Sequence, residues 1–224
     1  MAHPSIRKGP ELLKRKQSLL THLKRHPEYL YVLFIPAYLL CFFLMERLVP
    51  VEGYWVSYLP LDDRIPFLEC FVIPYCLWYL LLPFTGVVLL LTDVPELRRY
   101  MRFLMLGFGV SMLFCLLVPN GQDLRPAEFA RDNPFTRVLA AIYAVDTNTN
   151  VLPSMHVVGC GASASAAFGS RGPLRRVRWG VLALCLLVCA STVLVKQHSL
   201  LDLLAGLALC LPISLLLYGK ARKS

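Results

Sequence analysis

Charged residues are scarce in this chain of 224 amino acids. They make up 17% of the residues, whereas hydrophobic residues make up 57%, and the mean hydropathy is +0.58. A soluble globular domain has about 25% charged residues and an apolar share of about half. The shortage of charge therefore excludes an ordinary soluble domain and indicates a membrane protein.

Acidic residues are the rarer charged type: 14 Asp and Glu stand against 23 Lys and Arg, for a net charge of +9. A nucleic-acid-binding protein gathers its basic residues into a patch or stripe. Here they lie between apolar stretches, which is the pattern of membrane topology. We therefore expect the lipid bilayer as a partner, and no nucleic acid.

The sequence also lacks a C-x-x-C pair and an obvious signal-peptide cleavage site. Its eight cysteines lie almost entirely within apolar runs, so we expect small buried side chains rather than a zinc site. No small-residue cleavage site follows the first apolar run. We therefore expect that run to remain in the protein as a membrane anchor.

Six apolar stretches are each long enough to cross a bilayer, which takes about 20 residues in a helix. They run at 28–45, 65–92, 100–118, 153–168, 179–195 and 199–218. The sequence thus predicts an all-α fold, a bundle of six membrane helices. We expect a basic segment at 1–27, the membrane catalytic domain at 28–219 and a basic tail at 220–224.

The basic residues also predict the orientation of the chain. Seventeen of the 23 Lys and Arg residues lie on the side of the two termini, and six lie on the other side. Because Lys and Arg concentrate in cytoplasmic loops, we expect both termini in the cytoplasm of a cell-membrane protein. The long polar stretch at 119–150 and the starts of the fourth and sixth spans would then share the outer face.

Two polar blocks, at 153–156 and 191–202, stand where predicted spans meet water. His198 and Asp202 are four residues apart and would share a helix face, so the carboxylate can orient the imidazole. His156 follows Pro153 and Ser154 at the expected start of a helix, where free N–H groups attract anions. Two histidines, a carboxylate and an anion site predict phosphoryl chemistry at the outer face.

Histidine-based hydrolysis of a phosphate ester needs a nucleophile, an acid for the leaving oxygen and groups that hold the phosphate. We predict His198, oriented by Asp202, as the nucleophile and His156 as the general acid. The predicted phosphate-binding residues are Arg125, Ser154 and Lys196. No cofactor or metal is expected, although two histidines and a carboxylate would also suit a metal ion or simple interhelical hydrogen bonding.

Other polar and aromatic residues receive less specific predictions. Several loop residues are candidates to line the entrance of the site: Asn120, Gln122, Asp123, Asp146, Asn148 and Asn150. Six aromatic residues are expected in interface belts or in helix packing: Tyr54, Trp55, Tyr58, Tyr75, Trp78 and Tyr79.

The two blocks resemble motifs of the type 2 phosphatidic acid phosphatase superfamily, whose pattern is K-x6-R-P, then P-S-G-H, then S-R-x5-H-x3-D. The chain matches the first motif only as Arg125-Pro126 and the second with Met155 in place of glycine. It matches the third at Ser191, His198 and Asp202. The order and spacing of the motifs agree with the family.

Two cations of the family pattern are replaced. Val118 stands where the family has lysine, and Thr192 stands where it has arginine. Lys196, two residues before His198, is a candidate to supply one of the missing charges. With these departures the chain is more similar to the branch that includes inositol phosphorylceramide and sphingomyelin synthases, which pass the phosphoryl group to a lipid alcohol.

The resemblance implies an integral membrane lipid phosphatase that hydrolyses a lipid phosphate or pyrophosphate through a phosphohistidine. Its substrate would be a phospholipid or a prenyl phosphate. Two alternatives stay open: a lipid phosphotransferase with a lipid alcohol as acceptor, and a transporter that binds an anion without chemistry. The oligomeric state is also left open.

Overall fold

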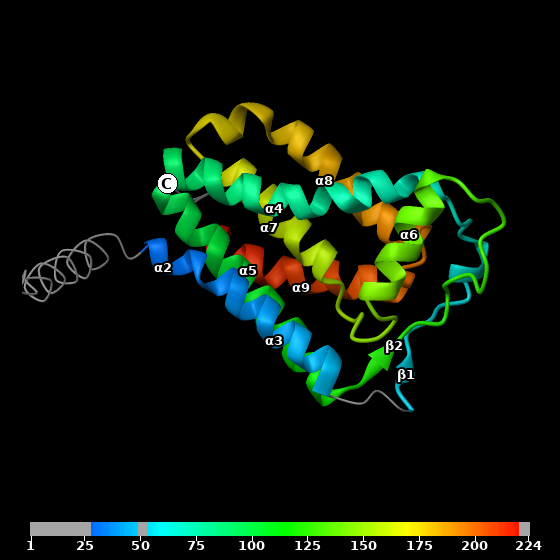
Figure 1. Cartoon of the computed structure of the whole chain (residues 1–224). Helices are drawn as coiled ribbons and strands as arrows, with labels where there is room; N and C mark the ends of the chain where they lie inside the picture. The colour runs from blue at the N-terminus through cyan, green and yellow to red at the C-terminus, as the bar shows by residue number, and fades with distance from the viewer. Residues whose placement is uncertain (1–27, 49–52, 220–224) are drawn as a thin grey trace, which may run out of the picture.

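The computed structural model describes residues 28–48 and 53–219, and this part of the chain is mostly α-helical (Figure 1). The predicted basic segment at 1–27 and the tail at 220–224 lie outside the described residues. In chain order the α-helices are α2 (Glu28–Val32), α3 (Phe34–Leu48), α4 (Val72–Thr92), α5 (Val94–Leu117), α6 (Pro134–Val145), α7 (Met155–Gly169), α8 (Arg178–Leu194) and α9 (Leu200–Tyr218). Short 3-10 helices occupy Asp62–Arg64, Glu69–Phe71 and Pro173–Val177.

Within the described ranges, four helical segments are long and apolar enough to cross a membrane. They are Glu69–Thr92, Val94–Leu117, Pro173–Leu194 and Leu200–Tyr218. Many of their leucines point outward, as expected for helices that face lipid, and Leu91, Leu211 and Leu216 are each more than 60% exposed. These four segments support an integral membrane protein.

The expected count of six spans is not confirmed. The first expected span is divided at Leu33 into α2 and α3, and both α3 and α7 have 15 residues. A helix of that length is about 22 Å long, whereas the hydrocarbon core of a bilayer is about 30 Å thick. Hydropathy alone counted these two stretches as spans because it registers apolar composition and not where the helix breaks.

Helix α7 lies at the centre of the bundle, where it contacts α4, α5, α8 and α9 (Figure 1). Small residues allow this close packing. A Cβ atom added at Gly206 of α9 would lie 2.8 Å from the Cβ atom of Val157 and 3.0 Å from the carbonyl oxygen of Ser154. Because α7 and α9 begin with the two polar blocks, their close approach brings the blocks together.

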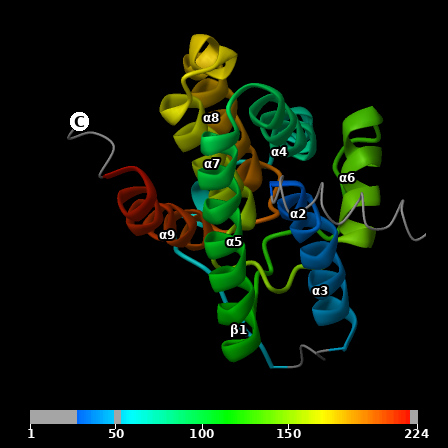
Figure 2. The same cartoon turned by 90° about the vertical axis from the view of Figure 1, so that its left-hand side faces the viewer.

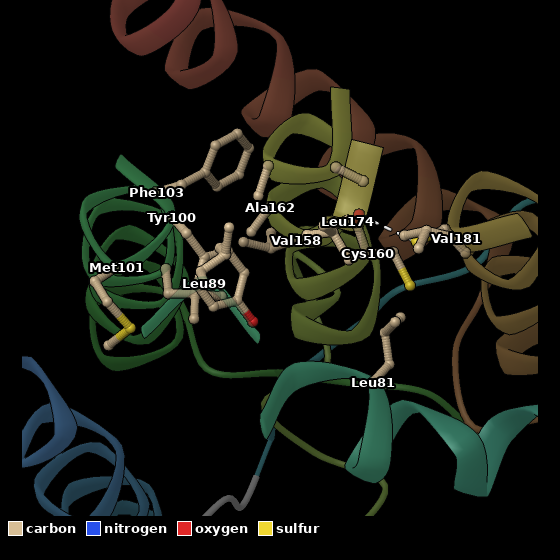
Figure 3. Packing of buried hydrophobic residues seen from close by; sticks show 14 of the residues in the cluster. Leu81, Leu89, Tyr100, Met101, Phe103, Val158, Cys160, Ala162, Leu174 and Val181 are labelled. Atoms are coloured by element: carbon tan, nitrogen blue, oxygen red, sulfur yellow. Dashed lines mark hydrogen bonds between the residues drawn. The ribbon is translucent and has the colours of Figure 1, made fainter. Parts of the chain in front are cut away.

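The main apolar core forms around α7. Figure 3 shows Phe103 and Tyr100 of α5 facing Ala162 and Val158 of α7, and all four side chains are almost fully buried. Figure 2 shows α3 and α9 on opposite sides of α5. The core therefore fixes α7 in place, and α7 carries His156.

One end of the bundle holds α6 and two short strands, on the right of Figure 1. Strand β1 (Trp55–Val56) pairs in parallel with β2 (Asn120–Gly121), with Trp55 opposite Asn120. Helix α8 ends and helix α9 begins at this end, whereas α2 begins and α9 ends at the opposite end. The loops that carry the two polar blocks thus meet at one end of the molecule.

Helix α6 lies in the stretch that the sequence analysis treated as a polar loop. Its start is a capping box: the Asn133 side chain accepts hydrogen bonds from the backbone N–H groups of Phe135 and Thr136, at 2.9 and 3.1 Å. Pro134 occupies the first position of the helix, where its missing N–H costs nothing. This start signal is readable in the sequence and would have predicted the helix.

Candidate active site

The Asp202 carboxylate contacts the His198 ring at the start of α9. Ser199 is the N-cap residue, and its Oγ accepts a hydrogen bond from the Asp202 N–H at 3.2 Å, while Asp202 Oδ2 accepts from the Ser199 N–H at 2.8 Å. The same Oδ2 lies 3.3 Å from His198 Nδ1. The expected contact four residues apart is therefore present, but His198 precedes the helix instead of lying on it.

The two histidines are in direct contact. His156 Nδ1 lies 3.2 Å from His198 Nε2, and both rings are buried, with 8% and 6% of the residue exposed. If Asp202 holds the proton on His198 Nδ1, then His198 Nε2 is the acceptor and His156 Nδ1 donates to it. The order Asp202, His198, His156 gives a nucleophilic nitrogen with a proton donor beside it.

Aromatic rings of α4 enclose His156. The centroids of Trp78 and Tyr75 lie 4.4 and 4.6 Å from the imidazole centroid, and Tyr79 meets it edge-on at 6.3 Å. Trp78 Nε1 also donates to the His156 carbonyl oxygen at 3.1 Å. The sequence predicts these aromatics in interface belts or in helix packing. Their spacing of three and four residues is the signal for a shared helix face.

Ser154 lies at the N-cap of α7 and is fully buried. Its N–H donates to the carbonyl oxygen of Asp202 at 3.1 Å. Among the described residues, neither Ser154 Oγ nor His156 Nε2 has a hydrogen-bond partner. Ser154 Oγ can therefore donate to an oxygen atom of a ligand at the start of α7, where the helix dipole favours an anion, and His156 Nε2 can do so when the imidazole is protonated on both nitrogens.

Arg125 joins the end of α6 to the turn that presents His198. Its guanidinium donates to the carbonyl oxygens of Tyr143 (3.3 Å), Asp146 (3.0 Å) and Thr147 (2.8 Å), and to the side-chain oxygen of Gln197. The guanidinium also lies over the Tyr143 ring, 4.5 Å from its centroid. Burial lowers the pKa of Arg125 from its usual value, and neighbouring negative charge opposes that shift.

Lys196 points toward the segment before α4. Its Nζ donates to the carbonyl oxygens of Asp62 at 2.9 Å and Ile65 at 2.7 Å, and its backbone has φ of 54°. Burial lowers the pKa of this ammonium group. Within residues 28–48 and 53–219, no hydrogen bond joins Lys196 to either histidine, so the structure does not bring this residue to the pair.

Asp146 and two glutamines complete the surroundings. Asp146 Oδ2 accepts from Gln197 Nε2 at 3.4 Å and from the Tyr75 hydroxyl at 3.5 Å. Burial raises the pKa of Asp146, and Glu46 adds to this effect. Gln122 Nε2 donates to the Lys196 carbonyl oxygen at 3.0 Å, which fixes the turn before His198. Of these residues, the sequence analysis named Asp146 and Gln122 as loop residues and missed Gln197.

The described residues contain no group of three His, Cys, Asp or Glu side chains placed to hold a metal ion. The geometry instead combines a paired imidazole, a second imidazole and an anion-binding helix start. These groups suit a protein of the class that acts on phosphate esters.

Comparison with known families supports this class. A family model described as the PAP2 superfamily matches residues 103–224, which is more than half of the chain. The chain therefore belongs to the PAP2 superfamily, the type 2 phosphatidic acid phosphatases that its motifs resemble. No curated protein and no solved structure matches the chain. Membership supports a membrane phosphatase or phosphotransferase with a phosphorylated lipid as substrate.

Proposed function

We propose that the protein is an integral membrane lipid phosphatase that works through a phosphohistidine on His198. The observation that carries the proposal is the hydrogen-bond series from Asp202 Oδ2 to His198 Nδ1, at 3.3 Å, and from His198 Nε2 to His156 Nδ1, at 3.2 Å. It leaves a basic nitrogen on His198 and a proton on His156, which are the two groups that the reaction needs.

In the first step, His198 Nε2 attacks phosphorus and the bond from phosphorus to the lipid oxygen breaks. His156 enters this step as an imidazolium, protonated on both ring nitrogens. It gives its Nδ1 proton to the departing oxygen, so His156 becomes a neutral imidazole and the lipid leaves as a neutral alcohol. In the second step, water gives a proton to His156 and attacks phosphorus, which breaks the phosphorus–nitrogen bond and releases phosphate. The phosphate has to enter between the two rings, so the rings move apart when substrate binds.

The phosphate oxygens would be held at the start of α7. Ser154 Oγ and His156 Nε2 supply unpaired polar atoms there, and the helix dipole adds positive potential. Arg125 contributes charge next to Gln197. Lys196 contributes only at longer range, because its ammonium group is bound to carbonyl oxygens of the segment before α4. Charges of this kind stabilise a phosphoryl transition state without taking part in bond formation.

An apolar groove supports a lipid substrate. It lies between α4 and α6, with a volume of about 350 Å³, and is lined by Tyr79, Val138, Ala141, Ile142, Val145 and Asp146. Tyr79 also meets the His156 ring edge-on, so the groove lies next to the aromatic cluster that encloses His156. A phosphate at the histidines would place the apolar chain of the same molecule in this groove.

We infer that the site lies at the outer face and that both termini are cytoplasmic. The support is the distribution of basic residues. Arg98, Arg99 and Arg102 lie in the first half of α5, and Arg171, Arg175 and Arg176 lie in the turn before α8. In Figure 1, α5 begins at the end of the bundle opposite α6. A cluster of this kind marks the cytoplasmic end of membrane helices. A reporter fused near Arg131 should be detected outside the cell, and a cytoplasmic signal would contradict this orientation.

A lipid phosphotransferase is the second candidate. Both histidines are more than 90% buried, and a site that limits water favours transfer to a lipid alcohol over hydrolysis. The two enzymes share the first step and differ only in whether water or the alcohol attacks the phosphohistidine.

The purified protein should be tested with a panel of labelled donors: phosphatidate, a prenyl pyrophosphate, a sphingoid phosphate and phosphatidylglycerol phosphate. Each donor is supplied with and without diacylglycerol or ceramide as acceptor. Free labelled phosphate supports the phosphatase, and a labelled acceptor lipid supports the transferase. Turnover by His198→Asn would contradict both, as would activity that EDTA abolishes and zinc or magnesium restores.

A further inference from the structure

Ser57 contacts the carboxylate that orients His198. It follows β1, is fully buried, and its Oγ donates to Asp202 Oδ1 at 2.5 Å. The same Oγ lies 2.8 Å from Ser199 Oγ. The family match covers residues 103–224 only, so membership in the superfamily assigns nothing to this serine.

The protons of the cluster can be assigned from its hydrogen bonds. Ser199 Oγ accepts from the Asp202 N–H, so its own hydrogen is free to point to Ser57 Oγ. Ser57 then uses its single hydrogen for Asp202 Oδ1, because a carboxylate accepts and cannot donate. The hydroxyls therefore form one directed chain, from Ser199 to Ser57 to Asp202, in which each bond polarises the next.

Asp202 thus receives donors on both of its oxygens. Oδ2 accepts from the Ser199 N–H and lies against His198 Nδ1, and Oδ1 accepts from Ser57. Donors on both sides prevent the carboxylate from rotating about its bond to the side chain. They also spread its negative charge, so that less of it acts on the imidazole.

The backbone holds Ser57 in this place. Its N–H donates to the Gly121 carbonyl oxygen at 2.7 Å, in continuation of the β1–β2 pair. Further along the same segment, Asp62 Oδ1 accepts from the Leu200 N–H at 2.7 Å. The segment from β1 to Asp62 is therefore tied both to the strand that precedes Arg125 and to the first turn of α9.

We propose that Ser57 is a positioning residue of the active site: its hydrogen bond fixes the orientation of the Asp202 carboxylate against His198 and takes up part of the negative charge of that carboxylate. This inference rests on the proposed function. It goes beyond that function by assigning a role to a residue outside the family motifs.

The test compares three substitutions of Ser57. Ser57→Ala removes the donor, Ser57→Cys keeps the size but donates weakly, and Ser57→Thr keeps the hydroxyl. We expect Ser57→Ala and Ser57→Cys to lower kcat about tenfold, which corresponds to the loss of one hydrogen bond to a charged group. KM should change little, and Ser57→Thr should recover most of the rate.

The pH profile separates positioning from general support of the fold. The charged and titratable groups around His198 are Asp202 of α9, His156 of α7, and Asp146 and Arg125 beside α6. Without the Ser57 donor, the carboxylate has more charge to stabilise the imidazolium. The acid limb of the kcat/KM profile should therefore move to higher pH in Ser57→Ala and Ser57→Cys.

Ser111→Ala is the matched control. Ser111 is also fully buried, and its Oγ has no hydrogen-bond partner among the described residues, so this variant should keep the wild-type profile. Ring NMR of histidine-labelled protein adds a readout that needs no turnover. At one fixed pH, a larger share of His198 should be imidazolium, protonated on both ring nitrogens, in Ser57→Ala than in the wild type. If Ser57→Ala does not fold, Ser57→Cys carries the test.

Two failures can be told apart. If the wild type turns over phosphate esters and the Ser57→Ala and Ser57→Cys variants keep its kcat and pH profile, the role of Ser57 is wrong and the proposed function stands. If no labelled donor is turned over by the wild type, the proposed function fails. The protonation state of His198, measured by ring NMR, then tests the role of Ser57 by itself. An unchanged ring signal in the variants overturns that role.

Discussion

Ser154 donates its backbone N–H to the carbonyl oxygen of Asp202 at 3.1 Å. This bond joins the start of α7 to the first turn of α9, two segments that lie almost 50 residues apart in the chain. Ser154 lies two residues before His156, so this hydrogen bond connects the segment that carries His156 to Asp202, the residue that orients His198. The distance between the two imidazoles therefore depends on how closely α7 and α9 pack.

Gly206→Ala tests this dependence. The added methyl group would lie 3.0 Å from the Ser154 carbonyl oxygen and 2.8 Å from the Val157 Cβ atom, so the start of α7 has to move. We expect a loss of about 1–3 kcal/mol in the free energy of unfolding, as for an overpacked core, and a lower kcat. Thermal unfolding in detergent and donor turnover measure the two effects.

The control for Gly206→Ala is Gly109→Ala in α5, where an added Cβ meets no atom within 4 Å. That variant should be as stable as the wild type or slightly more stable, because alanine favours a helix. Equal effects of the two substitutions would mean that the α7–α9 contact does not position the histidines.

The two histidines should respond differently to the leaving group. Loss of the general acid in His156→Gln should slow hydrolysis of an alkyl lipid phosphate by about 10²- to 10⁴-fold. It should have much less effect on an aryl phosphate such as p-nitrophenyl phosphate, whose leaving oxygen needs no proton. His198→Asn should abolish turnover of both. If His156→Gln slows both substrates equally, His156 is not the acid.

Arg125→Lys should lower both stability and kcat/KM. The guanidinium makes four separate hydrogen bonds, to three carbonyl oxygens and the Gln197 side chain, and lysine cannot reproduce this fork. We expect a loss of about 1–3 kcal/mol in the free energy of unfolding. Arg137→Lys is the matched control, because Arg137 forms only an exposed ion pair with Asp132, of a kind that contributes about 0–1 kcal/mol.

Asp146 should make the protein less stable as the pH rises. Burial raises the pKa of Asp146 in the folded protein above its value in the unfolded chain. Between these two values the folded state binds more protons, so the free energy of unfolding falls with increasing pH. Asp146→Asn does not titrate and should remove this slope in thermal unfolding measured across the acidic range.

Asp132→Asn provides the opposite case for comparison. The ion pair with Arg137 lowers the pKa of Asp132, so its contribution to stability grows as the pH rises through that range. If Asp146→Asn and Asp132→Asn change the slope in the same direction, the assignment of the Asp146 effect to burial is wrong.

Ala141→Phe should narrow the range of accepted lipids. Ala141 lines the groove between α4 and α6, and a phenyl ring there would fill part of its volume of about 350 Å³. Turnover of a long-chain donor should fall, while a short-chain donor keeps its rate. Ala183→Phe is the control: Ala183 is exposed on α8 and does not line the groove, so chain-length preference should be unchanged.

The parts of the site that could be predicted are those set by short spacings. His198 and Asp202 are four residues apart, and any turn or helix start keeps them within reach, so their contact follows from local geometry. The family motifs also placed His156 in the same site, and the superfamily is confirmed. The arrangement of Ser57, Trp78 and Gln197 around them depends on contacts between distant segments, which no single sequence pattern records.

The six-span prediction is not confirmed, for a related reason. Apolar composition identifies a stretch that avoids water, but it does not distinguish a helix that faces lipid from one that is surrounded by other helices. Helix α7 is of the second kind: its buried residues include Gly159, Ala162 and Ser163, and the helix is short. The partners of Lys196 could not be predicted either, because they are backbone carbonyl oxygens, which every residue has.

The tilted contact of the Trp78 ring with His156 provides an intrinsic optical probe of the candidate site. An indole 4.4 Å from an imidazole has its fluorescence quenched more strongly when that ring becomes positively charged. The chain has three tryptophans, and the other two, Trp55 and Trp179, are each about half exposed or more. Emission from Trp78 alone, isolated by replacing the other two with phenylalanine, would report ring separation and proton movement in real time without any added label.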